Sequence, residues 1–210
     1  MPDWAIYLAN ALMESLKARD PYTYGHCKRV AHTAKQLAKA AGLDVNTQIA
    51  IEYSSMFHDL GKMAIPDRIL LKPGRLTPKE EAIMRIHPVK SVEILNPLAK
   101  VPFFKDVMPG VRSHHERMDG LGYPDKLGGE QIPLTARVIL IADTFDAMTT
   151  DRPYRNGLPF DVAYAELKKF AGRQFDPQLV KIFLEAHPKW QGFEEEITAA
   201  FVASHFKKVA

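Results

Sequence analysis

One segment of the chain, from Thr47 to Leu60, is apolar around its whole circumference when it is read as a helix. Its only charged residues, with histidine taken as neutral, are Glu52 and Asp59, and large apolar side chains point in nearly every other direction. A helix of this kind is stable only when other elements surround it, so it belongs in the middle of a domain. The rest of the chain must therefore supply the elements that cover it.

The pattern outside this segment is also helical and predicts an all-α fold, a helical bundle. Residues 30–41 carry an apolar stripe with helical spacing, which Gly42 ends. A capping box opens a helix at Thr77, and Asp176 caps another. The apolar run 138–141 is compatible with a buried strand, but the spacing of its neighbours favours a helix. We therefore expect further helices over 103–115, 135–149 and 193–207, and an ordered loop rich in glycine and proline over 116–133.

The composition is that of one globular domain spanning residues 1–210. A chain of 210 residues with 46% apolar side chains can fill one core, and no repeat or linker divides it. The net charge of +3 gives no reason to expect a nucleic-acid duplex or a membrane as a partner. The single cysteine excludes an intrachain disulfide, and no apolar stretch approaches the ~20 residues needed to cross a bilayer. We expect a soluble, cytoplasmic protein.

Several histidines and carboxylates fall where the pattern predicts burial. His26 lies on an apolar stripe, the pair His58-Asp59 ends the apolar segment, and Asp143 follows the run 138–141. A buried carboxylate costs several kcal/mol unless it is paired or bound to a metal ion. A cluster of neutral imidazoles and carboxylates is what a site for two metal ions needs, because a carboxylate can bridge two cations. The alternative is a set of separate core histidines with an aspartate as a cap, and spacing alone leaves both open.

Longer motifs resemble the HD-GYP subgroup of the HD phosphohydrolase superfamily. His26, His58-Asp59 and Asp143 match the H…HD…D signature, and residues 58–62, 114–124 and 141–155 match the subgroup's motifs in order. The second of these contains Gly122-Tyr123-Pro124. The resemblance extends over about 8–183, which leaves 184–210 as a C-terminal helical extension. It implies a single-domain helical bundle of the HD-domain type, with the glycine- and proline-rich loop near a metal site.

The resemblance also implies a cofactor, a substrate and the residues that bind them. The cofactor is two divalent metal ions, iron or manganese first, with nickel or zinc as alternatives. The implied metal ligands are His26, His58, Asp59, His87, His114, His115 and Asp143. Asp59 is the expected bridge, and Lys62, Arg152 and Arg155 are the expected contacts of the substrate's phosphates. The implied substrates are cyclic dinucleotides, above all cyclic di-GMP, cleaved to pGpG and in some members onward to GMP.

Elementary chemistry agrees with these roles and leaves some alternatives open. A phosphodiester resists attack because its anionic oxygens repel nucleophiles, so catalysis needs charge neutralisation and positioning. Lys62 lies about one turn beyond Asp59, and we expect both residues to be catalytic. Arg152 and Arg155 are three residues apart and could fork onto phosphate oxygens. The alternatives are an exposed lysine that closes a helix and a surface pair of the arginines with Asp151.

The Gly122-Tyr123-Pro124 loop permits two interpretations of equal weight. In the first, Tyr123 belongs to the substrate-binding residues and stacks on a guanine, or the loop closes the mouth of the site or binds a partner protein. In the second, the loop is a rigid support for Asp119 and the His114-His115 pair. At the other end of the chain, the amphipathic segment 4–18 is interpreted as a first bundle helix, as the end of a signalling helix, or as the contact of a homodimer.

The function expected from all this is metal-dependent hydrolysis of cyclic di-GMP in bacterial second-messenger signalling. The alternatives are a phosphohydrolase of another cyclic dinucleotide, such as 3′,3′-cyclic GMP-AMP, and a non-catalytic module that binds a dinucleotide or a protein. The complete ligand set argues against the last. Some HD-GYP members hold a third ion through a glutamate one turn before the first histidine, where this chain has Tyr22. Asp20 precedes a proline and should lie outside that helix, so we expect two ions and mainly pGpG.

Overall fold

The computed structural model of the chain describes residues 3–151 and 156–190. Within these residues the secondary structure is entirely helical, with ten α-helices and four short 3-10 helices, which confirms the all-α prediction. The α-helices are α1 (Asp3–Arg19), α2 (Pro21–Ala40), α3 (Val45–Phe57), α4 (Asp67–Leu70), α5 (Pro78–Met84), α6 (His87–Leu95), α7 (Pro102–Ser113), α8 (Leu134–Thr149), α9 (Phe160–Lys169) and α10 (Pro177–Ala186). The 3-10 helices are η1 (Leu60–Ala64), η2 (Asn96–Leu98), η3 (Gly129–Gln131) and η4 (His187–Lys189).

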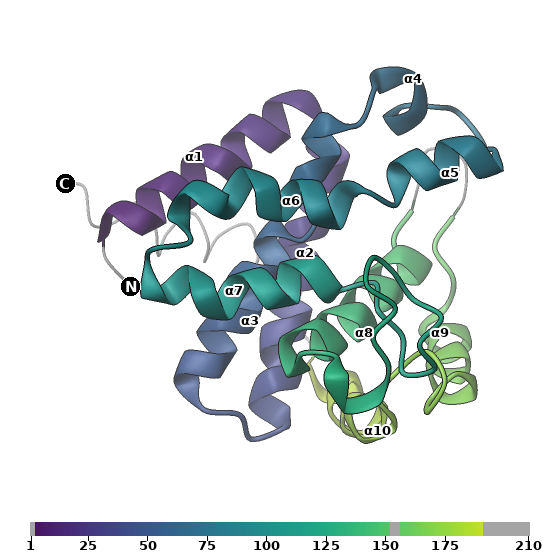
Figure 1. Ribbon diagram of the computed structural model, residues 1–210. Coiled ribbons are helices and arrows are strands. Elements are labelled where there is room, and N and C mark those ends of the chain that lie inside the picture. The colour runs from purple at the N-terminus through teal and green to yellow at the C-terminus, as the bar shows by residue number, and fades with distance from the viewer. Residues whose placement is uncertain (1–2, 152–155, 191–210) are drawn as a thin grey trace.

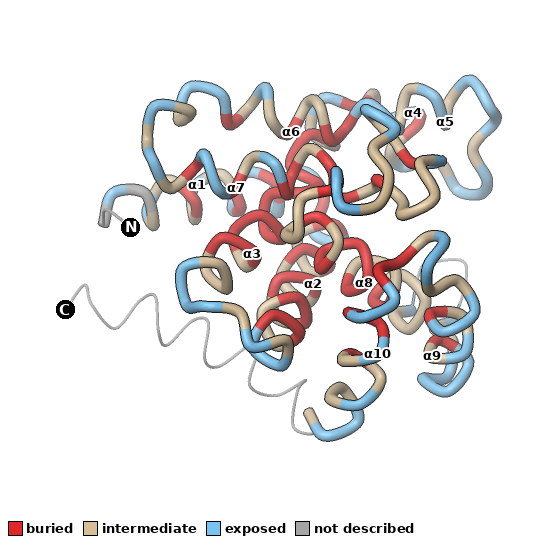
Figure 2. Tube along the Cα trace, turned by 60° about the horizontal axis from the view of Figure 1, so that its bottom comes forward, coloured by how far each residue is buried: buried red, intermediate tan, exposed pale blue. Residues whose placement is uncertain are grey.

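The apolar segment forms α3, and it lies in the interior as expected. α3 packs against α2, α7 and α8 (Figure 1), and its buried residues, 50, 51 and 53–57, lie toward its C-terminal end. Figure 2 shows the buried positions concentrated in α2, α3 and α8, whereas α5 and α9 expose most of their length. The helix ends at Phe57, three residues before the end of the segment. The chain turns there because the Gly61 N–H donates to the Ser91 hydroxyl of α6 at 2.7 Å, which fixes η1 against α6.

Two apolar cores fill the bundle. One lies between α2, α8, α9 and α10 and includes Val30, Ile139 and Phe183. The other joins α1, α3 and α7 through residues such as Leu16 and Phe57. Both cores involve α2 and α3, which pack along each other, so residues at the ends of these helices lie between the two cores.

The caps that the sequence predicts are present. Thr77 and Glu80 form a reciprocal capping box at the start of α5, and the Asp176 carboxylate accepts the N–H groups of residues 178 and 179 at the start of α10. Asp20 caps α2 from outside, accepting the Thr23 N–H at 3.0 Å, as its position before a proline indicates. The run 138–141 belongs to α8 and not to a strand. The predicted helix 193–207 lies outside the described residues.

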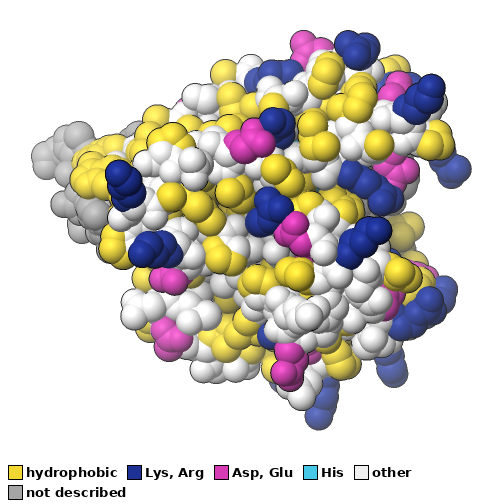
Figure 3. All heavy atoms as spheres, in the orientation of Figure 1, with side chains coloured by type: hydrophobic (Ala, Val, Ile, Leu, Met, Phe, Trp, Pro, Cys, Tyr) yellow, Lys and Arg dark blue, Asp and Glu magenta, His cyan; other side chains and the backbone are white. Residues whose placement is uncertain are grey.

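The surface and the helix lengths complete the description. Figure 3 shows one face of the molecule, on which basic and acidic side chains are interspersed with apolar ones. None of the described helices combines the length and the apolarity that a membrane crossing requires.

Candidate metal centre

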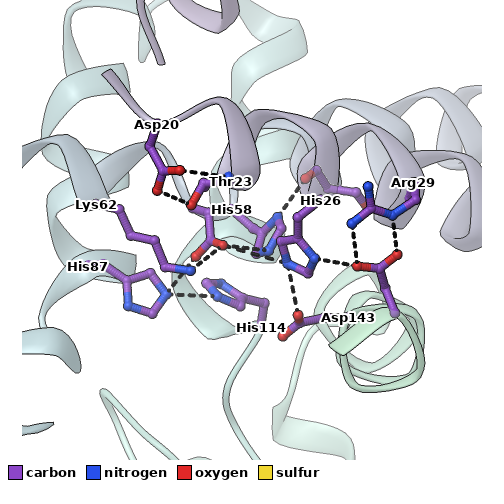
Figure 4. A network of polar contacts seen from close by, with 12 residues as sticks. Asp20, Thr23, His26, Arg29, His58, Lys62, His87, His114 and Asp143 are labelled. Atoms are coloured by element: carbon purple, nitrogen blue, oxygen red, sulfur yellow. Dashed lines mark hydrogen bonds and ion pairs between the residues drawn. The ribbon is translucent and has the colours of Figure 1, made fainter. Parts of the chain in front are cut away.

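Asp59 lies at the centre of the candidate site, where residues on or next to α2, α3, α6, α7 and α8 meet. Its side chain is 2% exposed and follows directly on the last turn of α3. One carboxylate oxygen, Oδ2, lies 3.4 Å from His58 Nε2 and 3.6 Å from His26 Nε2. The other oxygen, Oδ1, lies 3.2 Å from His87 Nε2. The two oxygens of Asp59 therefore face two different sets of imidazoles. Figure 4 shows His26, His58, His87, His114 and Asp143 gathered in one network of polar contacts.

The predicted ligands form two groups around this carboxylate. The His26 group consists of His26 on α2, His58 after α3 and Asp143 on α8, with ligand atoms within 4.8 Å of one another. The His87 group consists of His87 on α6 and the pair His114-His115 after α7, at the same spacing. Within the groups, His26 Nε2 lies 3.1 Å from Asp143 Oδ1, and His87 Nε2 lies 3.2 Å from His114 Nε2. The structure thus brings together all seven side chains that the sequence indicates.

Three of the imidazoles are oriented by their own helix ends. In each, Nδ1–H donates to the backbone carbonyl three residues earlier: His58 to Ser55 at 2.6 Å, His87 to Met84 at 2.9 Å, and His114 to Val111 at 2.7 Å. This hydrogen bond fixes the tautomer, so that the Nε2 lone pair of each ring points into the site. The rings are oriented as metal-ligating histidines are.

The donor atoms of the centre have the spacing and the free lone pairs that a divalent ion needs. His58 Nε2 is buried and has no hydrogen-bond partner among the described residues. The Nε2 atoms of His87 and His114 are both acceptors, and at 3.2 Å their lone pairs repel unless a cation lies between them. Ligands at about 2.0–2.2 Å from one ion are about 3 Å apart, which matches these spacings. The donor set of imidazoles and carboxylates suits Fe, Mn or Zn.

Burial keeps the imidazoles of the His87 group neutral. It lowers the pKa of His87 to about 3 and that of His115 to about 4, and it lowers the pKa of His114 well below the usual range. Burial likewise lowers the pKa of His58. A neutral imidazole is the form that binds a metal ion, so these rings are ready to act as ligands without first losing a proton.

Charge partners decide the ionisation of the remaining groups. Burial alone would raise the pKa of Asp59, but Lys62 and the surrounding imidazoles hold it well below the usual range. Burial alone would lower the pKa of His26, but its hydrogen bonds to Asp143 and Asp146 raise it to about 9. In the metal-free protein, His26 therefore carries the proton that Asp59 and Asp143 lack.

Asp146 was not indicated by the sequence, and it completes the surroundings of His26. Its Oδ2 accepts His26 Nδ1–H at 2.7 Å, and its Oδ1 accepts Arg29 Nε–H at 2.6 Å. This carboxylate accepts the Nδ1–H of His26 and so orients its ring, as backbone carbonyls orient the rings of His58, His87 and His114. The signal was spacing: Asp146 lies three residues after Asp143 on α8, and Arg29 lies three residues after His26 on α2.

Lys62 lies where the sequence indicates, beside the bridging carboxylate. Its Nζ is 2.6 Å from Asp59 Oδ2, and its side chain keeps 23% of its surface exposed. Burial would lower the pKa of Lys62, but Asp59 raises it, so the ammonium is retained. It faces a cavity of about 230 Å³, lined also by Tyr22, Thr23 and Ala147 together with residues of the His26 group.

The other predicted residues have varied positions. Tyr123 lies against His115, with ring centroids 4.7 Å apart, and Arg152 and Arg155 lie outside the described residues. Cys27 is buried next to His58 and Asp59, and burial raises its thiol pKa well above the usual value, as expected of a small packed residue and not of a metal ligand. The Asp20 carboxylate accepts both the N–H and the hydroxyl of Thr23, so it is engaged in capping α2.

An all-helical bundle with a buried centre of histidines and aspartates defines the class of this protein. The family model described as HD domain matches residues 10–179, most of the chain. The chain belongs to the HD domain family, and its motifs and relatives place it in the HD-GYP subgroup.

Two curated relatives and one solved structure illustrate the similarity. The "Cyclic di-GMP phosphodiesterase response regulator RpfG" of Xanthomonas campestris is 41% identical over 82% of this chain and 46% of its own length. The "3'3'-cGAMP-specific phosphodiesterase 2" of Vibrio cholerae is 40% identical over 83% of this chain and 33% of its own length. The chain spans less than half of either relative. The crystal structure of a cyclic GMP-AMP specific phosphodiesterase of V. cholerae has a TM-score of 0.67 at 17% identity, covering 95% of this chain and 52% of that chain, which shows the shared fold.

Proposed function

We propose that this chain is a metal-dependent phosphodiesterase domain that hydrolyses cyclic di-GMP to linear pGpG. One observation carries the proposal: six imidazole and carboxylate side chains from five segments surround the Asp59 carboxylate, beside a lysine and a cavity. The name of the 41% identical relative supports cyclic di-GMP as substrate. A second candidate substrate is 3′,3′-cyclic GMP-AMP, because a 40% identical relative carries that specificity in its name.

Two divalent ions, with iron or manganese as first candidates, fit the site. The His26 group would hold one and the His87 group the other, with Asp59 offering an oxygen to each. Such ions supply Lewis acidity toward phosphate oxygens and make water more acidic. A third ion would need another carboxylate near His26. Position 22 is a tyrosine, and the Asp20 carboxylate is engaged in capping α2, which supports two ions in preference to three. Two ions in turn favour pGpG as the main product.

The residues of the chain supply binding and charge. The Lys62 ammonium lies at the cavity, where it can contact an anionic phosphate while Asp59 holds it in place. Arg152 and Arg155 are proposed as further phosphate contacts. Asp146 keeps His26 oriented. A protein partner at the Gly122-Tyr123-Pro124 loop, a homodimer and a cytoplasmic location remain predictions from the sequence.

The proposal is tested with a panel of cyclic dinucleotides. The protein is purified without oxygen, loaded with Fe²⁺ or Mn²⁺, and incubated with cyclic di-GMP, 3′,3′-cyclic GMP-AMP and cyclic di-AMP, and the products are separated by chromatography. We expect cyclic di-GMP to be converted fastest to pGpG, with no turnover by Asp59→Ala. Faster conversion of cyclic GMP-AMP favours the second candidate. If the loaded wild-type protein leaves every dinucleotide intact, the phosphodiesterase proposal is wrong.

A further inference from the structure

We propose that Tyr123 is a positioning residue that holds the imidazole of His115 in the orientation a metal ligand needs. This inference rests on the proposed metal-dependent function. It concerns the loop for which the sequence left two interpretations, and it gives the tyrosine a role that acts through a ligand and not through the substrate.

Among the described residues, His115 lacks the hydrogen-bonded anchor that every other imidazole in the centre has. His58, His87 and His114 donate Nδ1–H to a backbone carbonyl, and His26 donates to Asp146. Across residues 3–151 and 156–190, the ring of His115 makes no such hydrogen bond. Something else must restrict rotation of this ring, because a loosely held ligand loses entropy when an ion binds.

The ring of Tyr123, which stacks on His115, restricts the rotation of the imidazole. Its centroid lies 4.7 Å from that of His115, and the two planes are 29° apart. On another side, His115 meets the edge of His87 at 5.0 Å and 85°. Tyr123 also approaches His87, at 6.5 Å and 80°. Offset and edge-to-face contacts of this kind are the favoured geometries of aromatic pairs.

The backbone around Tyr123 holds the ring in register with His115. The Tyr123 N–H donates to the carbonyl of His115 at 3.3 Å, so the two residues are paired through the main chain as well. At Gly122 the loop passes so close to the preceding segment that an added Cβ would lie 2.6 Å from the His115 carbonyl oxygen and 2.5 Å from Glu116 Cα. Only glycine permits this approach, and the approach brings the next ring onto the imidazole.

Glu116, the residue after His115, closes the loop. Its side chain is buried, and its carboxylate accepts the N–H of Asp125 at 2.6 Å and the N–H of Leu127 at 3.1 Å. Arg112 on α7 makes two ion-pair contacts of 2.7 Å with Asp125. The loop is thus fastened to the segment that carries the ligand directly after Tyr123.

Arg85, which ends α5, covers the tyrosine as well. Its guanidinium carbon lies 5.2 Å from the Tyr123 centroid, and its Nη2 is 2.5 Å from Glu81 Oε1. The imidazole of His115, at 4.7 Å, and the guanidinium of Arg85, at 5.2 Å, both pack on the Tyr123 ring. A guanine that stacked on Tyr123 would have to displace one of them, which is why we assign the ring to His115.

The test compares the binding of two ions by variants of the loop. Tyr123→Phe keeps the ring, Tyr123→Leu keeps apolar volume without a flat face, and Leu121→Ala changes an exposed side chain of the same loop as a control. Metal-free protein is titrated with Mn²⁺ or Co²⁺ against a competing chelator, which gives the affinity for each ion. Circular dichroism checks that each variant is folded. KM and kcat for cyclic di-GMP are then measured.

We expect Tyr123→Phe and Leu121→Ala to bind both ions as the wild type does. In Tyr123→Leu the weaker of the two affinities should fall roughly 10- to 100-fold, the usual effect of removing a group that orients a ligand. The kcat at limiting metal should fall with it, and excess metal should restore kcat with KM unchanged. Arg85→Gln, at a half-exposed position, should lower the same metal affinity by a smaller factor. This variant tests the proposal if Tyr123→Leu does not fold.

Two other results have distinct meanings. Unchanged affinity for both ions in Tyr123→Leu, with a raised KM at saturating metal, would refute the positioning role and assign Tyr123 to the substrate. Failure of the wild-type protein to bind any divalent ion would instead refute the proposed function, and the positioning role with it.

Discussion

Replacing Asp146 by asparagine should weaken metal binding in the His26 group without removing any ligand. The amide has the shape of the carboxylate, but it carries no charge and is a weaker acceptor for His26 Nδ1–H. The present contacts are 2.7 Å to His26 and 2.6 Å to Arg29, with Asp146 6% exposed. Hydrogen bonds of a buried, charged acceptor are about twice as strong as neutral ones, so the loss falls directly on the imidazole.

The size of the effect follows from the position of Asp146 behind a ligand. Removing such a carboxylate costs about 10- to 100-fold in metal affinity, or about 1.4 to 2.7 kcal/mol. Asp146 is also one of two carboxylates that raise the pKa of His26 to about 9. The pKa of His26 should therefore fall in the variant, which shows that the hydrogen bond, and not the fold, has been altered.

The assay is chelator competition with Mn²⁺ at pH 7.5, read as two stepwise affinities. Glu52→Gln on α3 is the control, because it removes the charge of another carboxylate, which pairs with Lys35 at 2.7 Å and is not a predicted ligand. One of the two affinities should fall in Asp146→Asn and neither in Glu52→Gln. Two unchanged affinities in a folded Asp146→Asn protein would refute the role assigned to this residue.

Four further outcomes are expected. Asp59→Ala should reduce metal content to less than one ion per chain and abolish turnover; retention of two ions by elemental analysis would contradict the bridging role. Lys62→Gln should keep both ions and lower kcat/KM about 100-fold, the order expected for one group that stabilises transition-state charge; equal kcat/KM would return Lys62 to an ordinary surface role. The metal-free protein should lose stability between pH 7.5 and 5, because His87, with a folded pKa of about 3, is protonated only in the unfolded chain over this range. The contribution of His87 to the free energy of unfolding is complete above pH ~6.5 and is about 2 kcal/mol smaller at pH 5. His26, whose pKa is raised, opposes this loss by a smaller amount. A free energy of unfolding in urea that increases on acidification would refute the prediction. Elemental analysis of anaerobically purified protein should give close to two ions per chain, and three would point to Tyr22 or Asp20 as an unexpected ligand.

Much of the fold followed from local pattern. The apolar circumference of residues 47–60 placed α3 at the centre, and the caps at Thr77 and Asp176 marked helix starts that the structure contains. These features are set by neighbours within a few residues, so a single sequence displays them. The end of α3 was three residues off because it depends on Ser91, which is distant in the chain.

The site was less accessible to pattern alone. Burial of His26 and Asp59 was predictable from their helices, whereas His87 was found only through the family resemblance, since it lies in a segment without a distinctive periodicity. Asp146 and Arg29 act through a pairing of α8 with α2, separated by more than a hundred residues. The contact of Arg85 with Tyr123 likewise exists only after α5 and the loop have come together.

The order of the ligand segments along the chain has a mechanical consequence. Ions held at once by the segments at His26, His58-Asp59, His87, His114-His115 and Asp143 close four consecutive loops of roughly 30 residues each. In a chain with a single cysteine, such ions would act as the cross-links that disulfides provide elsewhere, and removing them would take away the constraint they place on the loops between α2 and α8. Metal supply in the cell would then govern how long the protein resists proteases, as well as how fast it works.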